Sequence, residues 1–166
     1  MIFEIFLISL FSYISGSIPY GLIVTKLFLN QDIRKVGSKN IGATNVLRAG
    51  NKFYAILTLW LDIFKGFAPI IITNHYFPNL IYLSGMMAFL GHIFPVWLKF
   101  KGGKGVATYL GIILALSLKL GFIFCLSWIV IALLTRYSSL SSIVSTFLIF
   151  LISFLVAHSQ LSCIRT

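Results

Sequence analysis

Acidic side chains are the scarcest feature of this chain, since Glu4, Asp32 and Asp62 are the only three side-chain carboxylates among its 166 residues. So few carboxylates, so widely spaced, argue against a carboxylate-held metal ion and against a mechanism with paired carboxylates. The three histidines are dispersed, which argues against zinc. Cys125 and Cys163 stand in or beside apolar segments and form neither metal-ligand nor redox spacing. We therefore expect no metal and no cofactor.

Several familiar catalytic signatures are missing as well. A Walker A loop would need glycine at position 98 and serine or threonine at position 105, where Leu98 and Gly105 stand. The His-x-x-x-x-Asp signature of soluble-domain acyltransferases fails, because Trp97 stands five residues after His92. The start of the chain carries Glu4 and no basic n-region, unlike a secretory signal. These residues suit a reaction that depends on binding anionic groups and positioning the reactants, and less on a strong base from the protein.

Hydrophobic residues dominate what is present. They make up 59% of the chain against 10% charged residues, and the mean hydropathy is +1.02. No soluble fold would hide this much apolar surface. We expect an all-α, polytopic membrane helix bundle that forms a single domain over residues 1–166. About six transmembrane segments of roughly 20 residues fit the length, and the apolar runs place them at 5–25, 53–73, 80–98, 106–118, 120–135 and 143–156.

Positive charge is concentrated between the predicted helices. The formal net charge is +10, and of 13 lysines and arginines six lie in segment 26–52, three in 99–105 and one in 136–142. The positive-inside rule then places the N-terminus outside and these three segments on the cytoplasmic face of the membrane. No soluble domain carries the basic residues. We therefore expect membrane lipid and an anionic substrate as partners, and no nucleic acid.

Segment 99–105 is typical of an anion site at a membrane surface, because it holds three lysines and three glycines between two apolar runs. Glycines let the backbone approach a ligand, unpaired N–H groups at the start of the next helix face negative charge, and lysines supply full positive charge. The alternative is a glycine turn with lysines that anchor a helix end. That alternative fits Lys99 and Lys101. Gly102, Gly103 and Lys104 are predicted to bind an anion, and Lys101 stays among the substrate-binding candidates.

The segment 26–52 is the longest polar stretch, and its centre is rich in small hydrogen-bonding side chains. Four of them can donate to phosphate or hydroxyl oxygens, or cap a short helix: Ser38, Asn40, Thr44 and Asn45. Arg48 can grip an oxyanion with two parallel hydrogen bonds. The alternative is a solvated surface loop without a ligand.

The turn at 136–142 is rich in serine. Its serines can cap the last predicted helix. Ser139 and Ser142 are also candidates to face the basic loops, and both are counted among the substrate-binding candidates.

Two polar features lie inside the predicted spans. Pro19, between Gly16 and Gly21, can bend the first span and free backbone carbonyls for a neighbouring group or a ligand. The alternative is a plain proline kink, with small residues that allow close helix packing. Asp62 and Lys65, at i and i+3, share one helix face. A structural ion pair is the first interpretation of these two residues, and the second is that Asp62 orients a basic ligand-binding side chain.

Five ordered motifs carry a resemblance to a known family. They read Gly-Ser-Ile-Pro-Tyr-Gly (16–21), Val-Gly-Ser-Lys-Asn-Ile-Gly-Ala-Thr-Asn-Val-Leu-Arg (36–48), Leu-Asp-Ile-Phe-Lys-Gly (61–66), Gly-His-Ile-Phe-Pro-Val (91–96) and Phe-Lys-Gly-Gly-Lys-Gly-Val-Ala-Thr (100–108). In order and spacing the chain resembles the bacterial acyl-phosphate-dependent glycerol-3-phosphate acyltransferases, which are integral proteins of the bacterial plasma membrane. The resemblance runs from residue 1 to about residue 157.

The resemblance implies transfer of a fatty acyl group from acyl phosphate to the sn-1 hydroxyl of glycerol 3-phosphate, which gives lysophosphatidic acid for phospholipid biosynthesis. It implies that Ser38, Arg48 and Lys104 bind glycerol 3-phosphate, that His92 and Asn45 help to position it, and that the glycine loop cradles a phosphate. The family's substrate phosphate is thought to act as the base, with His92 as the competing candidate. A soluble enzyme that makes acyl phosphate is a further candidate partner.

One departure from the family leaves alternatives open. Family members continue into a seventh helix and a basic cytoplasmic tail, and we expect this chain to lack both. The alternatives are therefore an inactive truncated copy or a non-catalytic membrane subunit. A small-anion transporter is a third class, although transporters often show repeated halves and binding groups near the bilayer midplane.

Overall fold

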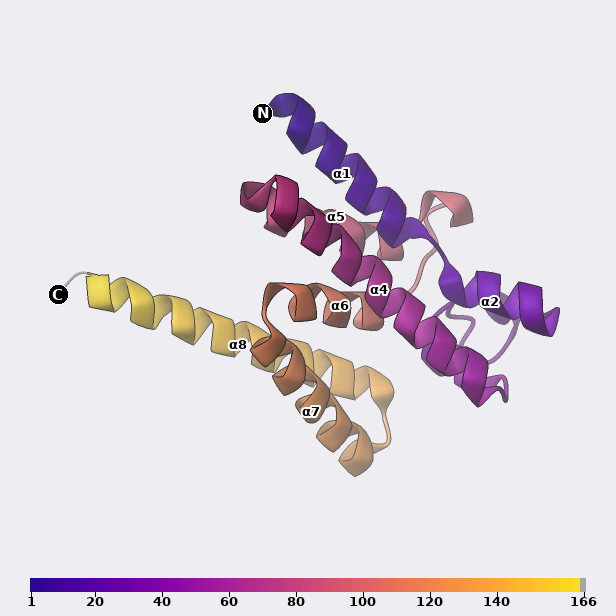
Figure 1. Cartoon of the computed structure of the whole chain (residues 1–166). Coiled ribbons are helices and arrows are strands. Elements are labelled where there is room, and N and C mark those ends of the chain that lie inside the picture. The colour runs from indigo at the N-terminus through magenta and orange to yellow at the C-terminus, as the bar shows by residue number, and fades with distance from the viewer. Residues whose placement is uncertain (165–166) are drawn as a thin grey trace. The chain divides into compact units, whose positions relative to one another are not determined.

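The computed structural model describes the backbone of residues 1–164 and the side chains of residues 1–156. This described part contains helices and no β-strand, as the sequence predicts (Figure 1). The α-helices are α1 (Ile2–Ser17), α2 (Tyr20–Leu29), α3 (Ala43–Arg48), α4 (Lys52–Tyr76), α5 (Ile81–Ile93), α6 (Val106–Leu116), α7 (Leu118–Thr135) and α8 (Ser138–Ile164). Three 3-10 turns join them: η1 (Ile33–Lys35), η2 (Pro78–Leu80) and η3 (Val96–Leu98).

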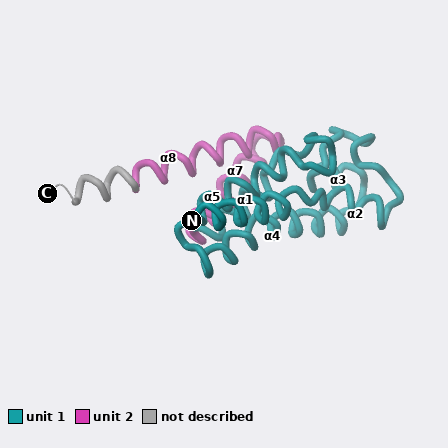
Figure 2. Tube along the Cα trace, turned by 90° about the horizontal axis from the view of Figure 1, so that it is seen from above, with its two compact units in different colours: residues 1–116 teal, residues 117–166 magenta. Residues whose placement is uncertain are grey.

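Two compact units make up the chain, residues 1–116 and residues 117–166 (Figure 2). The first unit contains α1 to α6 and both long polar loops. The second contains α7 and α8. The expected single domain over residues 1–166 stays a prediction.

The positions of the helices agree with the six predicted apolar segments. Five stretches are long and apolar enough to cross a membrane: Ile2–Leu29, Lys52–Tyr76, Pro78–Leu98, Leu118–Thr135 and Ser138–Val156. The sixth segment, α6, has 11 residues. At a rise of 1.5 Å per residue such a helix is about 16 Å long, roughly half the hydrocarbon thickness of a bilayer. The expectation of about six spans is thereby refined to five full-length helices and one short apolar helix.

The first span is broken where the sequence predicts a bend. α1 ends at Ser17, α2 begins at Tyr20, and Ile18 and Pro19 between them have extended or irregular backbone. The break frees the carbonyl of Ile18, which accepts a hydrogen bond from Lys65 Nζ at 2.7 Å. A buried neighbour thus satisfies this carbonyl, as the membrane interior requires.

Small residues let the helices of the first unit approach closely. α1 packs on α5, and α4 packs on α6. A Cβ on Gly16 would overlap the main-chain oxygen of Ala88, and a Cβ on Gly91 would overlap that of Tyr13. Glycine at both positions is therefore what permits the α1–α5 contact, the packing mode expected for membrane helices.

The second unit is a pair of packed helices, α7 and α8. Phe124 and Ile149 are buried, while Leu133 and Leu134 are 75% and 79% exposed. Such an apolar exterior fits contact with lipid chains. Cys163, for which no metal or redox role is expected, falls outside the residues whose side chains the structure describes.

Candidate active site on the two polar loops

The loop between α2 and α4 is organised around the side chain of Asn45. Asn45 Nδ2 donates to the main-chain oxygens of Ile33, Val36 and Asn40 at 3.1, 2.9 and 2.8 Å, and Oδ1 accepts from the amide of Ser38 at 2.9 Å. The residue is 1% exposed. Buried amides are stabilising when their donors and acceptors are satisfied. Asn45 therefore holds the loop in shape from inside and presents no side-chain surface to a ligand.

Apolar residues fasten the same loop to the helices. Ile33 and Val46 are fully buried and form a cluster with Leu22 of α2 and Ala55 of α4. This packing leaves the polar side chains outside: Ser38, Thr44 and Arg48 are all exposed. The loop is thus a folded element with a polar outer face, and the alternative of a loose solvated tether does not describe it.

Gly37 brings the backbone before Ser38 close to Arg48. Its φ is +52°, which L side chains rarely adopt. A Cβ at Gly37 would overlap Asn45 Oδ1 and would lie 3.9 Å from the Cβ of Arg48. The predicted ligands Ser38 and Arg48 therefore project from neighbouring backbone segments. Asn40 contributes to the same turn, because its Oδ1 accepts from the amide of Gly42 at 3.2 Å.

The glycine and lysine loop folds back onto the end of α5. The amide of Gly102 donates to the main-chain oxygen of Ile93 at 3.0 Å, and that of Gly103 donates to the oxygen of His92 at 3.2 Å. A Cβ on Gly102 would overlap both of these oxygens, and one on Gly103 would overlap His92 Nε2. Glycine is required here so that the loop can lie directly on the helix terminus.

These contacts correct one part of the expected phosphate cradle. The N–H groups of Gly102 and Gly103 donate to the last carbonyls of α5, which lack partners within the helix. They are therefore not open donors for a phosphate in this structure. Lys104 is exposed beside them and carries the charge of the loop toward solvent, and Gly105, with φ +78°, leads into α6.

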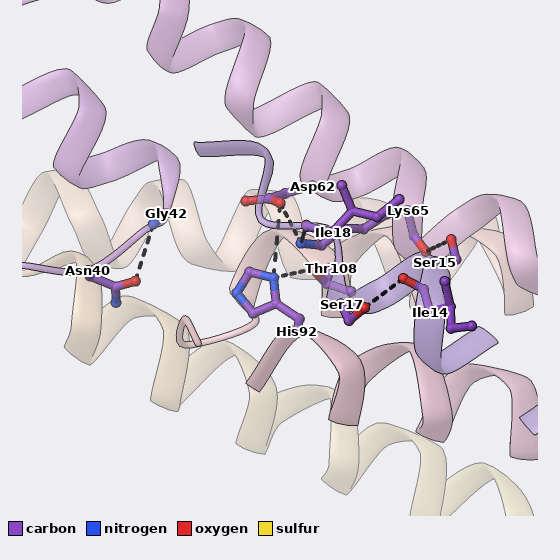
Figure 3. A network of polar contacts seen from close by, with 10 residues as sticks. All are labelled: Ile14, Ser15, Ser17, Ile18, Asn40, Gly42, Asp62, Lys65, His92 and Thr108. Carbon is purple, nitrogen blue, oxygen red and sulfur yellow. Dashed lines mark hydrogen bonds and ion pairs between the residues drawn. The ribbon is translucent and has the colours of Figure 1, made fainter. Parts of the chain in front are cut away.

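His92 lies beneath the glycine loop in a buried polar network (Figure 3). Its Nδ1 is 3.1 Å from Thr108 Oγ1 and 4.0 Å from Asp62 Oδ1. Asp62 in turn pairs with Lys65 at 2.8 Å, and the side chains of all three charged or titratable residues are at most 3% exposed. The first interpretation of Asp62 and Lys65, a structural ion pair, is confirmed by this geometry. The second interpretation is that Asp62 orients a basic side chain that binds a ligand. His92 is a basic side chain near Asp62, and its role toward a ligand stays a prediction.

The two polar loops meet at η3. Leu98 packs against the Ile33 and Val46 cluster, and a cavity of about 360 Å³ is lined by Arg34 from the first loop and by Lys99 and Lys101 from the second. Within the first unit, basic residues of the two polar loops thus line one cavity.

The serine candidates belong to the second unit. Ser142 Oγ accepts from Trp128 Nε1 at 3.0 Å and donates to the oxygen of Ser138 at 2.8 Å. This use is structural, since it joins α7 to α8. Ser139 is exposed near the start of α8. A role of either serine toward the basic loops stays a prediction.

The ion pair of Asp32 with Arg34 is a feature that the sequence analysis missed. Arg34 Nε and Nη2 donate to Asp32 Oδ1 and Oδ2 at 2.9 and 2.6 Å. The guanidinium holds the pKa of Asp32 well below its ordinary value, and the carboxylate raises the pKa of Arg34. The i, i+2 spacing of opposite charges directly after the first span was the available signal. The pair fixes Arg34 at the edge of the shared cavity.

The fold and the site together define a polytopic helical membrane protein with a basic, glycine-rich site on its polar loops. The chain belongs to the glycerol-3-phosphate acyltransferase family, whose model matches residues 6–165. Its relatives include the glycerol-3-phosphate acyltransferase of Pelagibacter ubique, 51% identical over 146 residues that cover 88% of this chain and 76% of that protein. The enzyme of the same description from Mesorhizobium japonicum is 46% identical, with 98% and 83% covered.

Solved structures agree with this assignment. The chain is similar to the crystal structure of PlsY (YgiH), an integral membrane glycerol 3-phosphate acyltransferase, in its glycerol 3-phosphate form. The TM-score is 0.87 at 42% identity, and the match covers 92% of this chain and 78% of that one. The lysophosphatidic acid form gives a TM-score of 0.84 at 40% identity, with 92% and 77% covered.

Proposed function

We propose that this chain transfers a fatty acyl group from acyl phosphate to the sn-1 hydroxyl of glycerol 3-phosphate and releases lysophosphatidic acid. The observation that carries the proposal is the meeting of the two polar loops at η3. This meeting places a basic surface beside apolar helices, in a chain that resembles a solved acyltransferase in its glycerol 3-phosphate form. We further propose that the site faces the cytoplasm from a bacterial plasma membrane, with the N-terminus outside. A soluble producer of acyl phosphate is the partner expected on that face.

The reaction needs no cofactor. The sn-1 hydroxyl oxygen attacks the carbonyl carbon of the acyl phosphate, and a new ester C–O bond forms. The anhydride C–O bond to phosphate breaks, and inorganic phosphate leaves with the electron pair. The hydroxyl proton passes to a phosphate oxygen. Because phosphate is a good leaving group, the protein can accelerate the reaction by holding two anions and aligning the hydroxyl.

The exposed polar side chains of the two loops are the proposed ligands of glycerol 3-phosphate. Arg48 and Lys104 neutralise its phosphate, and Ser38 donates a hydrogen bond from the neighbouring turn. Thr44, on the same exposed face of α3 and its flanking loop, is a secondary contact. Asn45 acts on substrate only through the loop that it shapes.

His92 positions the loop in this proposal and does not take the proton. Its side chain is 3% exposed, and Nδ1 already faces Thr108. The glycine loop lies on its ring, so the imidazole sets where Lys104 begins to project. The phosphate of the substrate is the proposed proton acceptor, which agrees with the absence of a carboxylate base: each carboxylate is engaged in an ion pair.

The test is formation of lysophosphatidic acid by the purified 166-residue chain in detergent or liposomes. It is given palmitoyl phosphate and labelled glycerol 3-phosphate, with palmitoyl-CoA as a parallel donor. Product from acyl phosphate alone supports the proposal. Product from palmitoyl-CoA alone would assign a different donor. A folded preparation shows a cooperative thermal unfolding transition. If such a preparation gives no product from either donor, the proposed activity of this chain is refuted.

A further inference from the structure

The imidazole of His92 lies in a buried network with the ion pair of α4 (Figure 3). Asp62 and Lys65 pair at 2.8 Å and balance each other in charge, and the side chains of all three residues are at most 3% exposed. A charged imidazole would add an unbalanced cation to this network, and burying such a charge is costly. His92 is therefore neutral and carries one N–H, either on Nδ1 or on Nε2.

Two polar groups face Nδ1 of this imidazole. Thr108 Oγ1 lies 3.1 Å away, and Asp62 Oδ1 lies 4.0 Å away. A hydroxyl group donates or accepts, so Thr108 fits either tautomer and does not select one. An ionised carboxylate only accepts, and its charge acts on Nδ1 although 4.0 Å is too long for a hydrogen bond. Asp62 therefore favours the tautomer with the proton on Nδ1.

A carbon–hydrogen group faces the other ring nitrogen, Nε2. The hydrogen of Gly103 that a Cβ would replace points at Nε2, since a Cβ there would overlap this nitrogen. A lone pair on Nε2 accepts such a weak contact from carbon, whereas an N–H would direct its proton against it. The surroundings of the two ring nitrogens therefore favour the same tautomer.

His92 holds Gly103 with its main chain as well. The amide of Gly103 donates to the main-chain oxygen of His92 at 3.2 Å. The glycine is thus fixed between the oxygen and the ring of one residue, and Lys104 follows it directly in the chain. A change at the ring would therefore move the point from which Lys104 projects.

We propose that Asp62 is a positioning residue that keeps the proton of His92 on Nδ1, so that the lone pair of Nε2 supports the glycine loop and fixes the start of Lys104. This assignment rests on the proposed function, in which Lys104 binds the phosphate of glycerol 3-phosphate. Asp62 touches neither substrate and acts through His92. It has two partners, because its charge also balances Lys65.

Nuclear magnetic resonance of the full chain, labelled with ¹⁵N-histidine, measures the tautomer directly. The protonated and bare nitrogens of a neutral imidazole have separate chemical shifts, and their couplings to the ring C–H groups distinguish Nδ1 from Nε2. His92→Gln identifies the signals by their loss. We expect the proton on Nδ1. A proton on Nε2, or a charged ring, in the original chain would overturn the proposal whatever the variants show.

Substitutions then test whether Asp62 is the cause. Asp62→Asn keeps the shape and removes the charge, so the proton should move toward Nε2. Because this variant leaves Lys65 unpaired and can fail to fold, the double variant Asp62→Asn with Lys65→Met, which removes both charges, should also lose the preference for Nδ1. Thr108→Val keeps the carboxylate and should retain it. An unchanged tautomer in the double variant, or a change in Thr108→Val alone, would refute the role of Asp62.

Kinetics connect the tautomer to the substrate. Asp62→Asn is expected to raise the KM for glycerol 3-phosphate by at least about fivefold, because Lys104 is displaced. The KM for palmitoyl phosphate should stay the same. Ser12→Ala is the matched control: it removes a buried hydrogen bond of the same unit, to Ser84 at 2.8 Å. It should leave the tautomer and both constants unchanged.

The tautomer and the activity can fail separately. An inactive chain that carries the proton on Nδ1, and loses this preference in the double variant, keeps the assignment of Asp62 toward His92 while the proposed function fails. An active chain in which Asp62→Asn moves the proton but leaves the KM for glycerol 3-phosphate unchanged overturns the positioning role.

Discussion

The ammonium group of Lys65 donates a hydrogen bond to the main-chain oxygen of Ile18 at 2.7 Å. This bond joins α4 to the non-helical break between α1 and α2. Asp62 lies 2.8 Å from the same ammonium group and compensates its charge. The break, the ion pair and the buried His92 are therefore parts of one connected network (Figure 3).

Lys65→Met is expected to destabilise the folded chain strongly. The substitution leaves the Asp62 carboxylate buried without its ion-pair partner. It also removes one of two donors to the oxygen of Ile18, the other being the amide of Tyr20. Removing one member of a buried pair costs about 3–5 kcal/mol. The thermal transition in detergent measures the effect. The double variant Asp62→Asn with Lys65→Met removes both charges and should recover part of the loss; if it is no more stable than the single variant, the ion pair is not the source.

Asn45→Ala is expected to disorder the first polar loop and to abolish most of the activity. Four hydrogen bonds are lost, and three main-chain oxygens lose a shared donor. Limited proteolysis should find new cleavage between residues 33 and 48. Asn45→Asp keeps the shape and the acceptor but lacks the donors, so it should behave like alanine. Full activity in Asn45→Asp would mean that the donors do not hold the loop.

Gly103→Ala is expected to displace the glycine loop from His92. The added methyl group would overlap Nε2 of the imidazole, so the loop or the ring must shift. We expect at least about a tenfold fall in kcat/KM, since a small displacement of positioning groups costs rate. Combining it with His92→Ala should relieve the overlap and restore the thermal transition. A single variant with unaltered kinetics would show that this contact does not set the loop.

Arg48→Ala and Lys104→Ala are each expected to lower kcat/KM for glycerol 3-phosphate. Hydrogen bonds between charged partners contribute about 1.5–3 kcal/mol, so the fall should be about tenfold to a hundredfold. Arg48→Lys keeps the charge and loses the bidentate geometry. Its kcat/KM should lie between that of the original chain and that of Arg48→Ala. Unchanged kinetics in both alanine variants would refute the proposed acceptor site.

The Asp32 and Arg34 pair gives a pH dependence with a defined sign. Arg34 lowers the folded-state pKa of Asp32 below its ordinary value, so the unfolded chain binds the proton more readily. The pair therefore contributes stability at neutral pH and down to the ordinary aspartate range of about pH 4, and loses it as the pH falls further. In a plot of the midpoint temperature of unfolding against pH, Asp32→Asn should reduce the fall at acid pH. The same fall of midpoint temperature at acid pH in the variant would exclude this pair as the cause of that fall.

Much of this structure follows from the amino-acid sequence, because hydropathy, charge and turn chemistry act locally. Apolar runs placed the helices within a few residues, Pro19 marked the break, and the spacing of Asp62 and Lys65 marked their pairing. The five motifs identified the family, which the comparisons confirm. The short length of α6 was also visible in the sequence, since the apolar run predicted at 106–118 is shorter than a spanning helix.

Only the tertiary structure decided what the polar side chains do. The side chain of Asn45 bonds to main-chain groups of its own loop, and the amides of Gly102 and Gly103 bond to the end of α5. The residue types alone did not indicate these partners. Trp97 donates a hydrogen bond to Ser17, which lies 80 positions earlier in the chain. A sequence pattern shows which groups can form hydrogen bonds. Which partner each group meets depends on how helices distant in sequence pack, because a buried polar group takes the partner that packing brings within reach.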